Sequence, residues 1–130
     1  MGTILVVDDD VELGNRICKL LEQRGHAVSQ VQDGRAALAF VRSHPVDLLL
    51  LDVLMPEMDG FETALQVRQI ASPPRVVLMS GGSDRFDRQY LMTVGGLMPV
   101  AGVLEKPFSL ESLFGTVEGA LLGQRVALRS

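Results

Sequence analysis

The sequence predicts an α/β fold: a (βα)5 doubly wound arrangement with a parallel five-stranded sheet between two layers of helices. Two observations predict it. Short apolar segments alternate with longer amphipathic segments along the 130 residues, which is the pattern of consecutive βαβ units. Most of the apolar segments contain no alternating polar residues, which is typical of parallel strands covered by helices on both faces.

The expected strands are short and rich in Val, Leu and Ile. They are residues 3–7, 27–31, 47–51, 75–79 and 102–105. Residues 27–31 alternate apolar and polar side chains, which favours a position at an edge of the sheet. The expected strand order is the flavodoxin-like order 2-1-3-4-5, one of the common doubly wound arrangements.

The expected helices have apolar residues at helical spacing on one face. They cover residues 11–24, 34–43, 61–70, 86–94 and 110–121. Asp10 and Ser109 are suitable N-caps for the first and last helix, and Gly25 is a suitable residue to follow the end of the first. Residues 1–122 are therefore expected to form one domain, and residues 123–130, which lack clear periodicity, a C-terminal tail or linker stub.

Composition excludes several classes of protein. The single cysteine, Cys18, cannot form an internal disulfide or a cysteine-rich zinc site, and a reducing cytoplasm is the expected location. With 12 basic and 16 acidic residues the net charge is −4, which argues against direct nucleic-acid binding. The apolar segments are too short for a signal peptide or a membrane span. His26 and His44 are expected to be surface residues.

Polar residues follow four of the expected strands. Asp8 and Asp9 follow the first strand, Asp52 the third, Ser80 the fourth and Lys106 the fifth. Because the carboxyl ends of parallel strands meet at one edge of the sheet, these side chains are expected to share one pocket.

The chemistry of this set points to phosphoryl transfer. Clustered carboxylates repel one another, and a hard divalent cation such as Mg²⁺ relieves that repulsion. Lys106 and the Ser80 hydroxyl suit phosphoryl oxygens, and Asp52 is best placed to be the attacking carboxylate. Taken singly, the acidic triplet could be a solvated turn with a helix cap, and Lys106 a surface lysine. The ordered combination favours the site.

Four motifs carry a resemblance to a known family. They are I-L-V-V-D-D-D at 4–10, L-L-L-L-D-V-L-M-P-E-M-D-G at 48–60, V-V-L-M-S-G at 76–81 and L-E-K-P-F at 104–108. In these motifs the chain resembles the receiver domains of two-component response regulators, over nearly its whole length.

The resemblance implies a role for each residue of the pocket. Asp52 would be the phosphoacceptor, receiving phosphate from a histidine of a sensor kinase or phosphotransfer protein. Asp8 and Asp9, with Asp52 and the backbone carbonyl of Leu54, would bind Mg²⁺. Ser80 would be the switch hydroxyl that follows phosphate. Lys106 would pair with the phosphoryl group, and the bond from Lys106 to Pro107 would be cis.

The resemblance also implies a signalling protein that is not an enzyme, with at most self-catalysed phosphorylation and dephosphorylation. Its output would pass to a downstream protein or an output domain, without nucleic-acid or membrane binding by this domain.

Two features depart from the usual receiver pattern. Val103 stands three residues before the lysine, where receivers usually have a tyrosine or phenylalanine that moves with the switch hydroxyl. Residues 95–101 form a connection about four residues longer than the usual one, judged by how closely a helix end meets the next strand. Both departures lie on the surface through which similar domains often dimerise.

Two other functions remain open. A Mg²⁺-dependent phosphohydrolase could use Asp52 as its nucleophile, but its general-acid aspartate would be expected at the position of Leu54. A degenerate receiver could bind partners without phosphate, but every charged residue of the pocket is present.

Overall fold

Five parallel strands form the centre of the protein. The computed structural model describes residues 2–53, 60–81 and 100–129. The strands are β1 (Thr3–Val7), β2 (Ala27–Val31), β3 (Leu48–Asp52), β4 (Arg75–Gly81) and β5 (Gly102–Lys106). Their order is β2-β1-β3-β4-β5, and every neighbouring pair is parallel. The predicted fold class, strand order and edge position of residues 27–31 are confirmed.

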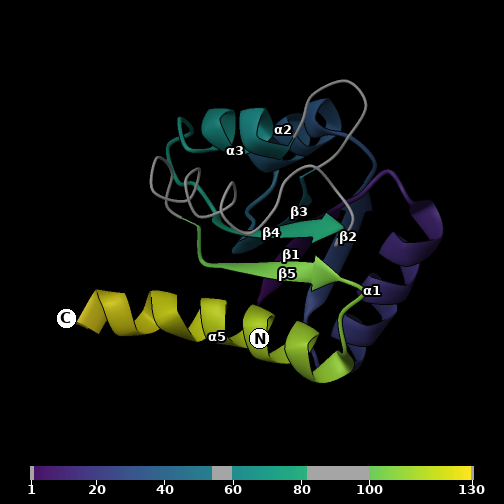
Figure 1. Ribbon diagram of the computed structural model, residues 1–130. Helices are drawn as coiled ribbons and strands as arrows, with labels where there is room; N and C mark the ends of the chain where they lie inside the picture. Colours follow the sequence, from purple (N-terminus) through teal and green to yellow (C-terminus); the bar gives the residue numbers. More distant parts are fainter. Residues whose placement is uncertain (1, 54–59, 82–99, 130) are drawn as a thin grey trace.

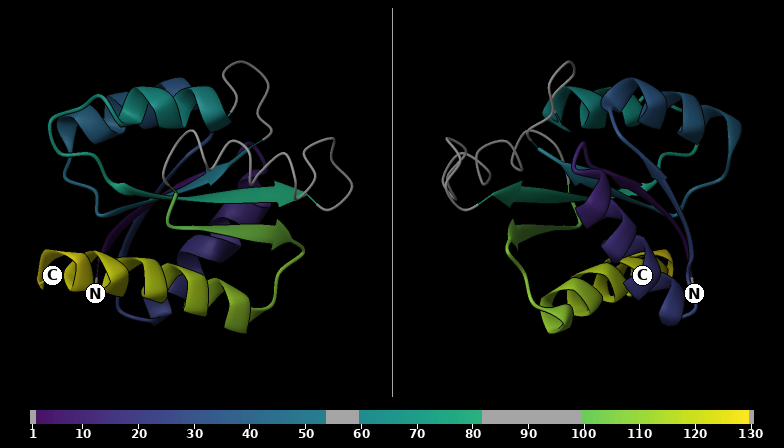
Figure 2. Two further views of the ribbon diagram at one scale, coloured as in Figure 1. Left: turned by 60° about the vertical axis from the view of Figure 1, so that its left-hand side comes forward. Right: turned by 90° about the vertical axis from the view of Figure 1, so that its right-hand side faces the viewer.

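Helices cover both faces of the sheet (Figures 1 and 2). α2 (Gly34–Ser43) and α3 (Gly60–Val67) lie on one face, and α1 (Val11–Gln23) and α5 (Leu110–Arg129) on the other. The helix expected over residues 86–94 lies outside the described residues. The described helices thus form the two outer layers that the doubly wound prediction requires.

The central strand β3 is buried on both faces. Leu49 and Leu51 pack in the cluster with α2 and α3, while Leu48 and Leu50 pack in the cluster with α1 and α5. All four side chains have no exposed surface. Residues 48–51 are therefore all apolar, because neither face of the strand is exposed to water.

Three strands reach further along the chain than the sequence predicts. β3 begins after Asp47 and ends on Asp52, and β4 and β5 continue to Gly81 and Lys106. The Asp47 carboxylate accepts a hydrogen bond from the backbone N–H of Thr3 at 2.9 Å, which makes Asp47 the cap of the neighbouring strand. Asp52, Ser80 and Lys106 are therefore held by the sheet itself.

The predicted helix ends are mostly confirmed. The Asp10 carboxylate accepts from the N–H of Leu13 at 3.1 Å, and the Ser109 hydroxyl accepts from the N–H of Ser112 at 3.0 Å. Gly25 has a positive φ of 94°, which only glycine adopts without strain. α5 continues to Arg129, through residues expected to form a tail. The domain boundary at residue 122 stays a prediction.

His26 is buried, contrary to the surface position expected for it, with 8% of its surface exposed. Its Nδ1 accepts from the N–H of Gly2 at 3.1 Å, and its Nε2 lies 3.5 Å from a carboxylate oxygen of Glu118 on α5. Arg24 pairs with both oxygens of Glu118, at 2.6 and 2.8 Å, and lies 4.7 Å from the ring centre of Phe114. This pairing lowers the pKa of Glu118 and raises that of Arg24. The contacts join α5 to the end of α1.

Two glycines in α5 lower its stability without a packing role. A Cβ at Gly115 or Gly119 would meet nothing within 4 Å. We expect Gly115→Ala and Gly119→Ala each to raise the free energy of unfolding by about 0.5–1 kcal/mol, because alanine restricts the unfolded chain. Urea unfolding followed by circular dichroism measures the change.

Gly14 in α1 is the matched contrast. A Cβ there would collide with the side-chain amide of Gln30, which donates to the backbone carbonyl of Val11 at 3.3 Å. Gly14→Ala should raise the free energy of unfolding less than either α5 substitution does, or should lower it. Equal stabilisation at Gly14 and Gly115 would contradict this account.

Candidate functional site

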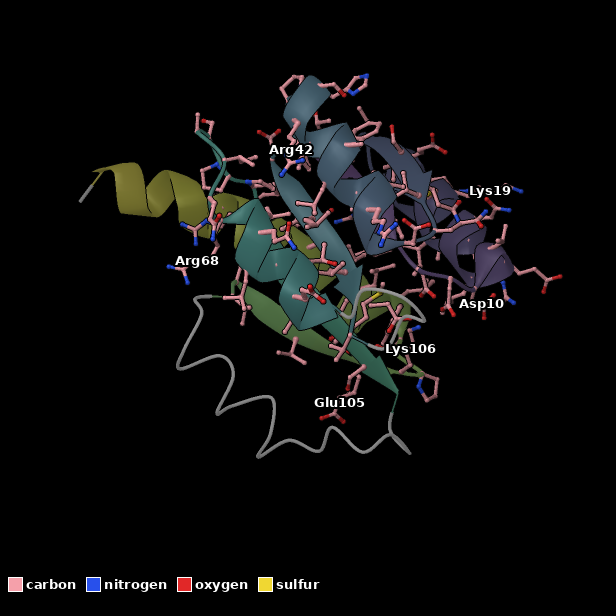
Figure 3. The ribbon with its side chains drawn as sticks, turned by 90° about the horizontal axis from the view of Figure 1, so that it is seen from above. Asp10, Lys19, Arg42, Arg68, Glu105 and Lys106 are labelled. Atoms are coloured by element: carbon pink, nitrogen blue, oxygen red, sulfur yellow. The ribbon has the colours of Figure 1, made fainter. Side chains whose placement is uncertain are left out.

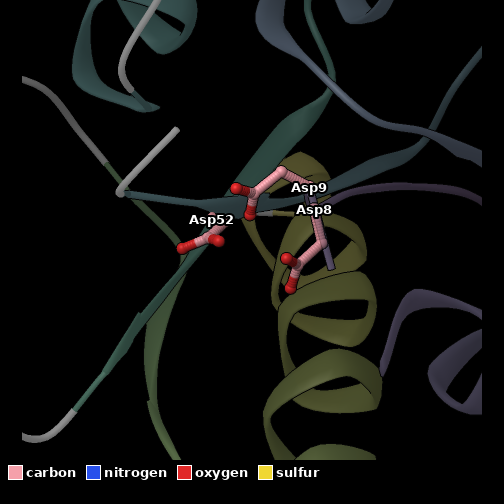
Figure 4. A group of neighbouring side chains, drawn as sticks. All are labelled: Asp8, Asp9 and Asp52. Carbon is pink, nitrogen blue, oxygen red and sulfur yellow. The ribbon is translucent and has the colours of Figure 1, made fainter. Parts of the chain in front are cut away.

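Three strands deliver the candidate site at the carboxyl edge of the sheet. Asp8 directly follows β1, Asp52 is the last residue of β3 and Lys106 the last residue of β5. Asp9 is the next residue after Asp8, at the turn into α1. Figure 4 shows the carboxylates of Asp8, Asp9 and Asp52 facing one another. The sequence prediction that strand ends gather these side chains is confirmed for this group.

The three carboxylates form one compact cluster. Each contributes an oxygen such that all three oxygens lie within 4.8 Å of one another. Asp8 has no exposed surface and Asp52 has 5%, whereas Asp9 is exposed. The cluster therefore has a buried floor and an open side from which a ligand can approach.

Lys106 bridges the two buried carboxylates. Its Nζ donates to Asp8 Oδ2 at 2.8 Å and to Asp52 Oδ2 at 3.4 Å. Burial alone lowers the pKa of Lys106, but the hydrogen bond to Asp8 and the charges of Asp52 and Asp8 outweigh it. The net pKa lies above the usual lysine value, so the group is an ammonium cation that compensates buried negative charge.

Asp8 is oriented by the backbone around it. Its Oδ1 accepts from the N–H of Asp10 at 2.9 Å, and its own N–H donates to the carbonyl of Val31 at 3.3 Å. Asp10 thus caps α1 with its side chain and fixes Asp8 with its backbone. Sequence reasoning identified the cap and missed this second role, for which the acidic triplet carries no separate signal.

Ser80 lies at the same edge, on the other side of Asp52's strand. It is 3% exposed and follows Met79, the residue of β4 paired with Asp52. Met79 packs toward α1 and α5, so alternation along the strand turns Ser80 toward the α2 and α3 face. Among the described residues, no hydrogen bond joins Ser80 to the cluster. The remaining predicted ligand, the carbonyl of Leu54, lies outside the described residues.

The cluster fits a divalent cation. Three carboxylates and one ammonium carry a formal charge of −3 + 1 = −2, so the cluster has excess negative charge at its open side. Carboxylate oxygens are the ligands preferred by hard cations. The donor atoms of Asp8, Asp9 and Asp52 are thus suited in number, chemistry and spacing to hold a metal ion.

Two further observations concern the departures noted in the sequence. Val103 lies on β5 beside Leu78 of β4, and 38% of its surface is exposed. Most of the long connection at 95–101 lies outside the described residues. The bond from Lys106 to Pro107 is cis, as the resemblance implies.

The chain matches, over residues 4–118, the family described as the response regulator receiver domain. It belongs to that family. A receiver domain is a phosphoacceptor module of two-component signal transduction, and the edge just described is where its chemistry is expected. None of the helices among the described residues of this receiver domain is long and apolar enough to cross a membrane.

Several known proteins are similar to this receiver domain. The transcriptional regulatory protein CpxR of Klebsiella pneumoniae is 37% identical over 121 residues, covering 93% of this chain and 50% of CpxR. The response regulator receiver protein CpdR of Brucella abortus is 32% identical over 122 residues, covering 94% of this chain and 98% of CpdR. The chain spans about half the length of the CpxR relatives that it matches.

The structural comparison agrees. Chemotaxis protein CheY4 of Vibrio cholerae superimposes with a TM-score of 0.82 at 28% identity, covering 91% of this chain and 97% of CheY4. The receiver domain of a histidine kinase from Syntrophus aciditrophicus gives the same TM-score at 29% identity, covering 95% of this chain and 92% of that one.

Lys106→Met should destabilise the receiver domain. The substitution keeps an apolar stem but leaves buried Asp8 without its ammonium partner. We expect the free energy of unfolding to fall by about 1–3 kcal/mol, the lower end reflecting the partial exposure of Lys106. Urea unfolding without divalent cations measures it.

Lys19→Met is the matched control, because Lys19 is exposed on α1 and makes no ion pair among the described residues. It should change stability little. A Lys106→Met protein as stable as the native protein would show that the buried carboxylates do not depend on this lysine.

Proposed function

We propose that Asp52 accepts a phosphoryl group from a phosphohistidine of a sensor kinase or phosphotransfer protein, in a Mg²⁺-dependent reaction. The observation that carries the proposal is the bridge of Lys106 between Asp8 and Asp52, beside a third carboxylate. Such a group of charges suits a phosphoryl acceptor, because phosphoryl transfer depends mainly on positioning and charge neutralisation.

The transfer is a displacement at phosphorus. A carboxylate oxygen of Asp52 attacks the phosphorus atom, the new P–O bond forms, and the P–N bond to the donor histidine breaks with its electron pair remaining on the imidazole. β3 holds Asp52 at its last position, where the carboxylate reaches the edge of the sheet without leaving the ladder of strands. The acceptor is thereby positioned before the donor arrives.

The neighbouring residues act on the charge of the transferred group. Lys106, already 3.4 Å from Asp52, would move its ammonium onto a phosphoryl oxygen. Asp8 and Asp9, with Asp52 and the carbonyl of Leu54, would hold Mg²⁺, which supplies positive charge to the phosphoryl oxygens when bound. Ser80, on the neighbouring strand end, would turn its hydroxyl toward the phosphate and so report its presence.

The output is a change of surface. The phosphoryl group adds negative charge at the strand ends and biases the contacts of the adjoining loops. We propose that this alters binding to a downstream protein or an output domain. The domain catalyses at most its own phosphorylation and dephosphorylation, in the cytoplasm, without direct contacts to nucleic acid or membrane.

The phosphohydrolase alternative is weaker. It requires a second carboxylic acid two residues after the nucleophile, where this chain has Leu54. The degenerate receiver is weaker as well, because the carboxylates and the lysine occupy one cluster rather than separate surface positions.

Incubation with Mg²⁺ and acetyl phosphate should add the mass of one phosphoryl group, measured on the intact protein. Asp52→Asn should abolish the adduct, because an amide oxygen cannot form the acyl phosphate. Asp33→Asn is the matched control: Asp33 caps α2 through Ala36, and asparagine caps equally well. An adduct that persists in Asp52→Asn would refute Asp52 as acceptor, and steady release of phosphate without an adduct would favour the hydrolase.

Lys106→Met should bind Mg²⁺ more tightly than the native protein. The ammonium and the metal ion compete for the same carboxylates, and removing one cation relieves repulsion on the other. Titration with Mg²⁺ by calorimetry should show a severalfold lower dissociation constant, with Lys19→Met unchanged. The same variant should accept phosphate more slowly. Weaker Mg²⁺ binding in Lys106→Met would contradict the shared site.

A further inference from the structure

A second concave site lies at the opposite edge of the sheet from Asp52. The C-terminal ends of α2 and α3 enclose a cavity of about 700 Å³, bordered by residues 41–46, 66, 69–72 and 74. This volume is in the range of sites that hold small organic molecules. Nothing in the proposed phosphoryl transfer uses this cavity.

The lining combines aliphatic and polar side chains. Val41, Val46 and Ile70 provide aliphatic surface continuous with the core cluster on this face. Gln66 and Gln69 of the α3 end provide amide groups. In a small-molecule site, aliphatic groups cover the apolar part of the ligand and polar groups fix its orientation.

The charge of the lining has one sign. Among the described residues, the ionisable ones that border the cavity are Arg42 and His44, and none is a carboxylate. Figure 3 shows Arg42 on α2 and Arg68 near the end of α3. Among the residues that the structure describes, no hydrogen bond or ion pair satisfies the guanidinium of Arg42, Arg68 or Arg75. Of these three arginines, Arg42 borders the cavity.

His44 is held in place before any ligand arrives. Its ring stacks on Phe40 with centroids 4.3 Å apart and planes inclined by 16°. Its Nδ1 lies 2.9 Å from the hydroxyl of Ser43, which itself donates to the carbonyl of Ala39 at 3.0 Å. Because the Ser43 hydroxyl donates to Ala39, its oxygen accepts from Nδ1–H, and Nδ1 also lies 3.3 Å from the carbonyl of Phe40. The second ring nitrogen, Nε2, has no partner among the described residues, and in this tautomer it carries a lone pair.

Helix ends explain part of this charge. The carbonyl end of a helix favours cations, which accounts for Arg42 in the last turn of α2 and Arg68 just after α3. It does not account for the lack of a carboxylate among the described residues that border the cavity.

We propose that this cavity binds a small organic anion with an apolar body, such as an aromatic carboxylate. The carboxylate would pair with the Arg42 guanidinium, and the apolar body would lie against Val46 and Ile70. A guanidinium and a carboxylate form a strong paired hydrogen bond. The site is independent of Asp52, so its failure would not bear on phosphoryl transfer.

The test is a titration of the full ¹⁵N-labelled chain with 2-naphthoate, followed by two-dimensional amide spectra. Saturable shifts are expected at the amides of His44, Val46 and Gln69. 2-Naphthamide, which has the same ring and no charge, should bind about tenfold more weakly. Absence of saturation, shifts centred on Asp8 and Lys106, or equal binding of 2-naphthamide would overturn the proposal.

Arg42→Gln should weaken 2-naphthoate binding by about tenfold. Arg16→Gln is the matched control, because Arg16 is exposed on α1, on the other face of the sheet, and has no partner among the described residues. An equal loss in both variants would show charge attraction without a site. Should Arg42→Gln fail to fold, Gln69→Glu tests the same prediction by placing a negative charge in the lining.

An acidic peptide of alternating Glu and Leu completes the test. If the peptide shifts the same amides at a lower concentration than 2-naphthoate, the cavity is a docking site for a protein segment and the small-anion proposal is wrong. Weaker or absent peptide binding supports the small-anion site.

Discussion

Asp8 is a carboxylate with no surface exposed to solvent, and a charge in that position must be compensated by the protein. The ammonium of Lys106 at 2.8 Å and the N–H of Asp10 provide that compensation. Both depend on the sheet, because Lys106 ends β5 while Asp8 follows β1, two strands separated by β3 and β4. These four strands must therefore pair in register before Lys106 can compensate the buried charge of Asp8.

This dependence links stability to the candidate chemistry. A buried ion pair adds little net stability compared with apolar packing, because both ions lose their hydration. The ion pair of Lys106 with Asp8 lies next to the exposed carboxylate of Asp9. A role in the candidate site explains this ion pair better than a contribution to stability does. Lys106 holds the carboxylates of Asp8 and Asp52 close together, and the proposed metal ion and phosphoryl group would use the same carboxylates.

Much of the fold could be predicted from the sequence, because its signals are local. Unalternated apolar runs indicate a covered parallel sheet, and residues such as Asp10 and Gly25 mark helix ends by their own backbone chemistry. The position of Asp52 followed from the same logic, since a polar residue after a buried strand must lie at the sheet edge.

What could not be predicted depends on contacts between distant residues. Buried His26 contacts Glu118, 92 positions away along the chain. The fit of Gly14 against Gln30 depends on how α1 crosses β2, and no pattern within either segment specifies it. Ser80 lies at the edge assigned to it from the sequence, and its role as the switch hydroxyl stays a prediction.

The four leucines of β3 have a consequence for folding. They are identical in chemistry and buried on both faces, so a shift of the strand by one residue would exchange one leucine for another at almost every position. Apolar packing alone therefore distinguishes these strand registers poorly. The two aspartates that flank the run do distinguish them: Asp47 bonds to Thr3 at one end, and Asp52 meets Lys106 at the other. The register of β3 is therefore set by the aspartates at its two ends, and one of them, Asp52, is the candidate phosphoacceptor.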